Sequence, residues 1–387
     1  MPSSTFASER SPAQIGDLAP KRVGILTFHR CINYGAYWQA RCLSQYFQQA
    51  GHHVELLDYR CLRYFLGEMR HALRPQRPAP KADVFGMLTK TIRFLSAQQR
   101  LQRTSLFNMT APPDFSHLDL LVVGSDEVWN LSHVHLGGVP LFFGETLRPR
   151  KLVAYAASFG SYNAAEGLPE VFAQRLRRFD RISVRDENSR QLATSGYGRD
   201  VPLVLDPCLQ FKPTASRSRS FSSSAYLLVY GKNFDPQIAM NAVAWARARG
   251  LRIVSIGYRN DWADVSILSA GPDDFVNAFR GASAVVTSYF HGCVFSLSFG
   301  KPFAVQLSNY RANKIRGLLS SVNSPHRILN PQTAERLEQL LSTPIEAAVI
   351  AGIAEQRQSS AAFLDECVKP LSQARNGPSA LISKMAG

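Results

Sequence analysis

The stretch AVVTSYFHGCVFSLSFGKPFAV, residues Ala284–Val305, decides the fold class. Its first residues are apolar and β-branched, which is typical of a buried strand, and PFAV at its end predicts a second strand. Between them lies a segment of helix length that opens with Phe290-His291-Gly292. A strand, a helix and another strand in this order indicate a parallel sheet.

The same alternation of apolar runs and helix-length segments continues along most of the chain. The runs are apolar throughout rather than at every second residue, which is typical of parallel strands covered on both faces. We therefore predict an α/β protein with two Rossmann-like domains that face each other across a cleft. The predicted strands are 22–28, 54–58, 118–123, 152–157, 181–184, 203–205, 225–230, 251–256, 284–287 and 303–305.

Composition divides the chain further. Residues 1–20 are polar, contain no apolar central segment typical of a secretory signal, and are predicted to form a mobile leader. The first domain is predicted at 21–211, with a basic helical insertion at 60–118. The Ser- and Arg-rich segment 212–224 is predicted to be a linker. The second domain, with helices at its end, is predicted at 225–387.

The totals are those of a globular protein with a sizeable core: 387 residues, of which 45% are hydrophobic and 19% charged. No apolar run reaches the roughly 18 to 20 residues needed to cross a bilayer. The six cysteines form no CxxC pair, which argues against a zinc site or a disulfide framework. A cytoplasmic protein is the expectation.

The net charge of +15 favours an anionic partner, and about half of this excess lies between Arg60 and Arg103. No zinc-finger or RNA-binding motif accompanies it, so we expect no nucleic-acid partner. Val84, Leu88, Ile92 and Leu95 recur at helical spacing in this segment. The helix could lie on an anionic membrane, or it could pack on the first domain with a solvated basic face.

Polar residues follow several predicted strands, where ligands of parallel sheets bind. Asn33 and Gly35 stand at a predicted helix start, which can hold an anion, or Asn33 can simply cap the helix. Asp126, in VVGSDEVWN, could contact a sugar hydroxyl, act as a base or cap a helix. There is no GxGxxG and no GxxxxGK[ST], which weighs against NAD or ATP.

Two further residues have side chains suited to binding an anion or to acid–base catalysis. Arg185, in ISVRDENS, follows a predicted strand and is suited to hold a carboxylate or phosphate with two parallel hydrogen bonds. His291 opens a helix, where a histidine that gains a proton as an anionic substrate arrives could act in acid–base catalysis. A histidine hydrogen-bonded inside the core is the alternative. Gly292 would let a ligand approach the backbone.

Taken in order, six segments resemble the polysaccharide pyruvyl transferase family over about residues 21–319. They are GILTFHRCINYGAYWQA, VVGSDEVWN, AYAASFG, ISVRDENS, VLDPCL and TSYFHGCVFSLSFGKPFAV. One departure is Tyr289, which stands where some members carry a basic residue. The resemblance implies a fold similar to two-domain (GT-B-like) glycosyltransferases. It also implies transfer of pyruvate from phosphoenolpyruvate to two sugar hydroxyls, which forms a cyclic ketal.

The resemblance also implies roles for these residues. His291 would handle the proton, and Asp126, on the acceptor side in the first domain, would deprotonate or orient the sugar. No cofactor and no metal is expected. Residues expected to bind phosphoenolpyruvate are Arg185, Asn33, Gly35, Ser288 and Gly292.

The resemblance implies only the class of acceptor, which is an exopolysaccharide or cell-surface glycan, or its lipid-linked precursor. A lipid-linked acceptor would bring the protein to the inner face of the membrane. Two other functions stay open from the sequence. One is a nucleotide-sugar-dependent glycosyltransferase of similar fold, and the other is a carbohydrate-binding subunit without turnover.

Overall fold

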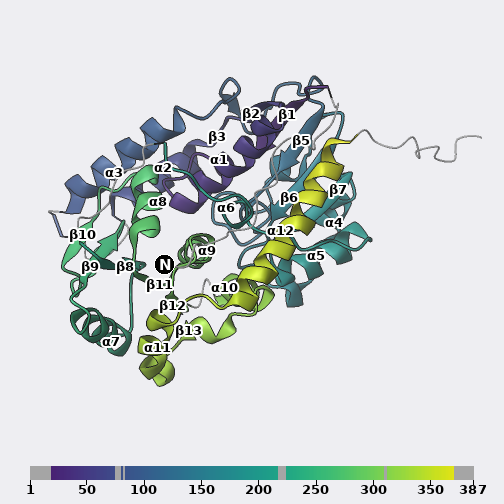
Figure 1. The fold of residues 1–387 in the computed structure, drawn as a ribbon. Coiled ribbons are helices and arrows are strands. Elements are labelled where there is room, and N and C mark those ends of the chain that lie inside the picture. Colours follow the sequence, from purple (N-terminus) through teal and green to yellow (C-terminus); the bar gives the residue numbers. More distant parts are fainter. Residues whose placement is uncertain (1–18, 75–79, 82, 217–223, 309–311, 370–387) are drawn as a thin grey trace, which may run out of the picture.

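Two parallel sheets dominate the computed structural model, and most helices surround them (Figure 1). The structure describes residues 19–74, 80–81, 83–216, 224–308 and 312–369. The predicted leader, up to residue 18, and residues 217–223 of the predicted linker lie outside the described residues. Every strand pairing in both sheets is parallel, so the predicted α/β class with two parallel sheets is confirmed.

The first sheet has five strands in the order β2-β1-β5-β6-β7. The central strands β5 and β6 are buried at every residue, because helices cover both faces of the sheet. A separate small sheet pairs β3 with β4. The strands are β1 (Arg22–Leu26), β2 (His53–Leu56), β3 (Tyr59–Arg60), β4 (Phe107–Asn108), β5 (Leu120–Val123), β6 (Leu152–Ala157) and β7 (Arg181–Val184).

The second sheet has six strands in the order β10-β9-β8-β11-β12-β13. Its β11 and β12 are the two strands predicted from the opening stretch, and they pair in parallel. The strands are β8 (Tyr226–Tyr230), β9 (Arg252–Ile256), β10 (Val265–Ile267), β11 (Ala284–Thr287), β12 (Phe303–Gln306) and β13 (Ile328–Leu329).

Helices connect the strands and join the two halves. The α-helices of the first half are α1 (Tyr34–Gln49), α2 (Leu62–Leu73), α3 (Asp83–Gln98), α4 (Glu170–Leu176), α5 (Glu187–Tyr197) and α6 (Pro207–Gln210). Those of the second half are α7 (Pro236–Arg247), α8 (Pro272–Gly281), α9 (Phe290–Ser298), α10 (Ala312–Ser321), α11 (Leu337–Ser342) and α12 (Ala347–Val368). Short 3-10 helices lie at Pro140–Phe143, Ala164–Glu166, Pro325–Arg327 and Pro331–Arg336.

The last helix, α12 (yellow in Figure 1), returns from the second half to the first sheet. Its end packs into the hydrophobic cluster of β1, β5 and β6 through Leu364, Cys367 and Val368. Lys151, which precedes β6, donates hydrogen bonds to the backbone carbonyls of Glu366 and Lys369. Nothing in the helical pattern of this segment indicates that it docks on a sheet so far away in sequence.

Most predicted elements lie within a few residues of those observed. An exception is residues 203–205, which form no strand; Leu203 makes only an isolated bridge to Val184. Among the described residues, no single helix has the length and hydropathy that crossing a membrane would require. The helices at Pro331–Ser342 and Ala347–Val368 meet those criteria only as a pair, which is bent by 80°.

Candidate functional site

The predicted site residues His291 and Arg185 come together where α1, α6 and α9 meet. His291 lies in the first turn of α9, directly after β11, and Arg185 follows β7 at the edge of the other sheet. Helices α1 and α6 are in contact, and α6 also contacts α9. The site is therefore built from both halves of the chain, as expected for parallel sheets whose strand ends face a common cleft.

Gln39 of α1 connects these two residues, and its side chain is almost fully buried. Arg185 Nη1 donates to Gln39 Oε1 at 3.0 Å, and the Ser125 hydroxyl donates to the same oxygen. Since a guanidinium can only donate, the amide oxygen must face Arg185. The amide nitrogen then faces His291, 2.9 Å from Nε2. In the neutral ring Nε2 thus accepts, and the ring proton is on Nδ1.

Asp206 is the second partner of both residues, and its carboxylate is buried. Arg185 Nη1 donates to its Oδ2 at 2.9 Å, and His291 Nε2 lies 3.7 Å from the same oxygen. Burial would raise the pKa of Asp206, but the His291 and Arg185 partners hold it below its usual value. A protonated Nε2 cannot accept from Gln39, so protonation would turn His291 toward Asp206.

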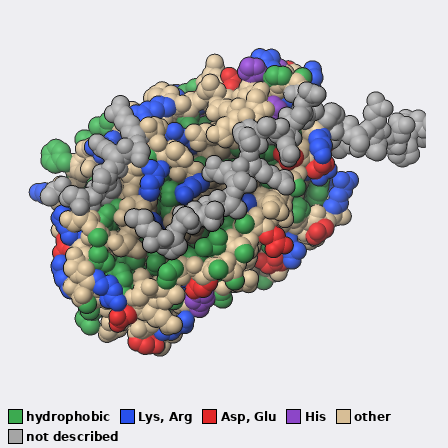
Figure 2. Space-filling model, viewed as in Figure 1, with side chains coloured by type: hydrophobic (Ala, Val, Ile, Leu, Met, Phe, Trp, Pro, Cys, Tyr) green, Lys and Arg blue, Asp and Glu red, His purple; other side chains and the backbone are tan. Residues whose placement is uncertain are grey.

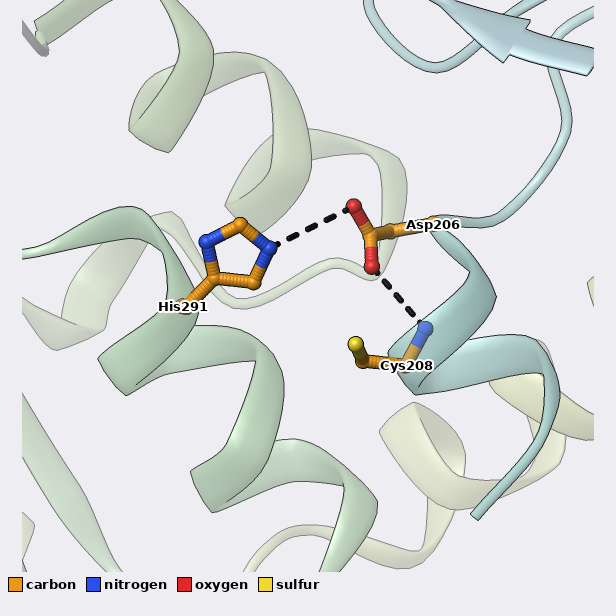
Figure 3. A group of neighbouring side chains, drawn as sticks. All are labelled: Asp206, Cys208 and His291. Atoms are coloured by element: carbon orange, nitrogen blue, oxygen red, sulfur yellow. Dashed lines mark hydrogen bonds and ion pairs between the residues drawn. The ribbon is translucent and has the colours of Figure 1, made fainter. Parts of the chain in front are cut away.

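Figure 3 shows Asp206 between His291 and Cys208. The other carboxylate oxygen accepts from the backbone N–H of Cys208, which places Asp206 as the N-cap of α6. These three side chains could in principle hold a metal ion. Asp206 Oδ2, the oxygen nearer His291, already accepts from the Arg185 guanidinium at 2.9 Å, and burial raises the pKa of the Cys208 thiol. The donor set therefore fits an ion-pair cluster better than a metal centre.

The guanidinium of Arg185 has several partners besides Asp206 and Gln39. Nη2 donates to Asp126 Oδ1 at 3.4 Å, and the ring of Phe290 lies 4.8 Å from the guanidinium carbon. Its Nε is buried and has no hydrogen-bond partner among the described residues. An unmet buried donor of this kind costs about 1–3 kcal/mol. Arg185 thus retains one N–H that a ligand could satisfy.

Glu127 and Lys314 form an ion pair beside Phe290, and this pair joins the first half to α10 of the second. Burial would raise the pKa of Glu127, but the Lys314 ammonium lowers it to about 2. Glu127 therefore stays charged at any physiological pH.

A pocket of about 550 Å³ opens beside this cluster. Arg185 and Asp206 line it from the first half, and Phe290, Asn313 and Arg316 line it from the second. The Arg316 side chain is exposed and forms no ion pair with any acidic residue of the described chain. Asp186 and Glu187 also line the pocket, and Glu187 pairs with Arg190. Arg316 is thus a lining cation without a carboxylate partner among the described residues, and an anionic group of a small ligand could pair with it.

Three other predicted residues have structural contacts that differ from the predicted ones. Gly35 lies against His291: a Cβ on it would be 2.0 Å from His291 Nδ1. The space beside Gly292 is filled by the side chain of Thr287, so a glycine here permits close contact between α9 and the end of β11. The Ser288 hydroxyl exchanges hydrogen bonds with the backbone of Lys232.

Asn33 caps α1, which was the simpler of its two predicted roles. Its side-chain oxygen accepts from the N–H groups of Gly35 and Ala36 at 2.8 and 3.2 Å. These are the N–H groups that a bound anion would otherwise use. An anion at this helix start would therefore have to displace the Asn33 side chain.

Residues 33–305 match the family described as polysaccharide pyruvyl transferase. The chain belongs to this family. Among curated proteins, the comparison found no match. The matched family region includes Gln39, Arg185, Asp206 and His291, so the whole central cluster lies within it, whereas Lys314 and Arg316 lie beyond its end.

Solved structures of several sugar-nucleotide enzymes are similar in fold at low identity. One is UDP-GlcNAc 2-epimerase from Neisseria meningitidis bound to UDP-GlcNAc, at 11% identity and a TM-score of 0.41, covering 88% of this chain and 99% of that chain. Another is the glycosyltransferase SsfS6 from Streptomyces sp. SF2575 complexed with thymidine diphosphate. It has 12% identity and a TM-score of 0.42, and the match covers 88% of this chain and 96% of that chain. A third is trehalose-6-phosphate synthase, with 8% identity and a TM-score of 0.43, in a match that covers 91% of this chain and 99% of that chain.

Sequence reasoning missed two central residues of this cluster. Gln39 and Asp206 lie in the segments GAYWQA and VLDPCL, which carried the family resemblance without being assigned a role. The available signal for Asp206 was Asp-Pro at the start of a short helix, but that is also an ordinary N-cap. Gln39 lies inside α1 and gives no local signal, since its partners are 86 to 252 residues away.

Proposed function

We propose that this protein transfers pyruvate from phosphoenolpyruvate to two hydroxyls of a sugar in an exopolysaccharide or cell-surface glycan, or in its lipid-linked precursor. The observation that carries the proposal is the cluster of partly buried His291 with buried Asp206 and Arg185, beside a pocket between the two halves, in a chain of the pyruvyl transferase family. It supplies a proton carrier next to fixed positive charge, which this chemistry needs.

Phosphoenolpyruvate brings a carboxylate and a phosphate a few atoms apart. The pocket presents Arg316 at its exposed side and Arg185, with its unmet Nε–H, at its buried side. Asp206 and Asp126 already neutralise much of the Arg185 charge. Full attraction for the donor therefore calls for a protonated His291, which would draw Asp206 toward itself and leave more of the Arg185 charge for the ligand.

The reaction needs two additions at one carbon. A proton adds to the methylene carbon, and the first sugar hydroxyl bonds to the adjacent carbon as it loses its own proton. The carbon–oxygen bond to phosphate then breaks, phosphate leaves with the bonding electron pair, and the second hydroxyl closes the ketal as it loses its proton. One of the two released protons replaces the proton consumed, and phosphate or solvent takes the other.

His291 is the proposed donor of the first proton. Asp206 stabilises the imidazolium, and Gln39 holds the neutral ring that remains after transfer. Gln39 is thus a positioning residue, because it acts through His291 and Arg185. Asp126 lies beside Arg185 with its side chain partly exposed, and we assign it to the acceptor hydroxyls.

The first test is thermal stabilisation by the donor. At about 100 times its dissociation constant, phosphoenolpyruvate should stabilise the folded state by about 2.7 kcal/mol and raise the melting temperature. Arg316→Gln should weaken this shift because it removes the exposed cation of the pocket. Arg199→Gln, an exposed arginine on the first half, is the matched control and should leave the shift unchanged.

UDP-sugars form the comparison arm of this experiment. Stabilisation by a UDP-sugar and none by phosphoenolpyruvate would replace the proposal with a nucleotide-sugar-dependent glycosyltransferase. Stabilisation by neither, in a protein that unfolds cooperatively, would leave no support for donor binding and would overturn the proposal.

Gly35→Ala tests the packing against His291. The added Cβ would lie 2.0 Å from Nδ1, so the ring must shift, which disturbs its hydrogen bond with Gln39. We expect a stability cost of about 1–3 kcal/mol from overpacking and a much larger loss of pyruvyl transfer. Gly352→Ala is the control: nothing lies within 4 Å of its Cβ position in α12, so stability should stay or rise by up to about 1 kcal/mol. Unchanged turnover in Gly35→Ala would contradict the assigned role of His291.

A further inference from the structure

The basic insertion exposes an apolar surface that no described part of the chain covers. Of the thirteen large hydrophobic side chains exposed in the described residues, eight lie between residues 62 and 106. On α3, Phe85 is 78% and Ile92 57% exposed, and on α2, Leu66 is 59% exposed. The full set is Leu62, Phe65, Leu66, Val84, Phe85, Leu88, Ile92 and Leu106, which we call the α2–α3 face.

The sequence left two orientations open for this helix, and in the structure its apolar stripe faces outward. The helix packs inward through Met87, Phe94 and Ala97, while the regularly spaced Val84, Leu88 and Ile92 face solvent. Its inner side is fixed to the second half: Asp83 pairs with Arg259, and Arg93 pairs with Asp274. The helix is thus held firmly with its apolar stripe outward, which is unusual without a partner.

Positive charge accompanies this face. Arg60, Arg63, Arg70, Arg74 and Lys81 are exposed, and none forms an ion pair with a described acidic residue. By contrast, Arg93, Arg100 and Arg103 are turned to Asp274, Asp273 and Asp58. Figure 2 shows hydrophobic side chains beside Lys and Arg along the upper left edge, where Figure 1 places α3, although grey atoms cover part of that region.

We infer that the α2–α3 face docks on an anionic phospholipid membrane. Leucine, isoleucine and phenylalanine side chains flanked by unpaired arginines match the chemistry of an interfacial surface: the apolar groups enter the acyl boundary and the arginines meet lipid phosphates. A second copy of this chain is a poorer occupant, because it would bring the same unpaired positive charges into the interface.

One hydrogen bond links the insertion to the chain segment before α1. Helix α2 and α3 contact one another, and Gln98 of α3 donates to the backbone carbonyl of Cys31. Cys31 lies in the short segment before α1, the helix that carries Gly35 and Gln39. Docking would therefore bring the acceptor side of the first half near the lipid surface. That last step rests on the proposed function, whereas membrane binding itself does not.

The test is co-sedimentation of the full chain with vesicles, without donor or acceptor. Vesicles of phosphatidylcholine alone are compared with vesicles that also contain phosphatidylglycerol. The wild type should bind the anionic vesicles, and added salt should weaken binding. Phe85→Gln, Leu88→Gln and Ile92→Gln together should weaken it roughly tenfold or more. Arg63→Gln with Arg70→Gln should weaken it about 30-fold and reduce its salt dependence.

Control substitutions elsewhere on the surface show whether a loss of vesicle binding is specific to the α2–α3 face. Met240→Gln, which changes an apolar side chain 59% exposed on α7, and Arg199→Gln should bind like the wild type. Thermal unfolding of the triple variant should resemble that of the wild type, because all three side chains are exposed. Absence of wild-type binding to anionic vesicles at low salt would overturn the inference. So would a dimer in sedimentation velocity that the triple variant converts to monomer.

Discussion

Replacing His291 by glutamine is expected to lower kcat for pyruvyl transfer by about 10²–10⁴-fold, the usual contribution of a positioned acid–base group. Glutamine fills much of the same space and can still meet Gln39 and Asp206, but it cannot carry a proton to the methylene carbon. The measurement is phosphate release from phosphoenolpyruvate in the presence of an acceptor glycan, with the ketal product followed by mass spectrometry.

Measuring phosphoenolpyruvate binding shows whether His291→Gln has lost only the proton transfer or also the binding site. His291→Gln should keep part of the thermal shift with phosphoenolpyruvate, since Arg185 and Arg316 remain. His53→Gln, in an exposed position of β2, is the control and should turn over like the wild type. If His291→Gln retained kcat within tenfold of the wild type, His291 would have no acid–base role and the proton source would have to be another group.

The overall fold was accessible from the sequence because its signals are local. Strands such as Leu152–Ala157 are apolar at every residue, and this pattern alone predicts a parallel sheet buried on both faces. The short β10 and β13 were missed, because strands of three and two residues at the sheet edge carry too few residues for a pattern. The strand predicted at residues 203–205 was wrong for the opposite reason: the segment is apolar, but it makes only one isolated bridge.

The site was accessible only in part. Arg185 and His291 were predicted, since charged or ionisable residues after apolar strands stand out locally. Glycines were harder to interpret, because a required small residue looks the same whether a ligand or a side chain approaches it. At Gly35 and Gly292 the neighbours are His291 and Thr287, which only the tertiary structure reveals. The same limit applies to α3, whose periodicity defined an apolar stripe but not which way it faces.

Replacing Arg185 by methionine is expected to destabilise the fold by about 3–5 kcal/mol, because it leaves the buried carboxylate of Asp206 without its cation. Asp126 would lose the same partner, although it is partly exposed. Methionine keeps the length and apolar contacts of the side chain against Phe290. Equilibrium unfolding in urea measures the change, and the thermal shift with phosphoenolpyruvate should disappear in the same variant.

A double-mutant cycle with Asp206→Asn assigns this cost to the pair. If the two groups stabilise each other, the double variant should be more stable than the sum of the two single changes predicts, by about 0.5–3 kcal/mol. The matched control is Arg190→Met on α5, whose pair with Glu187 is exposed and should contribute less than about 1 kcal/mol. Additive single changes would mean that Arg185 is held mainly by Gln39 and Phe290. Asp126 would then be the main carboxylate that offsets its charge.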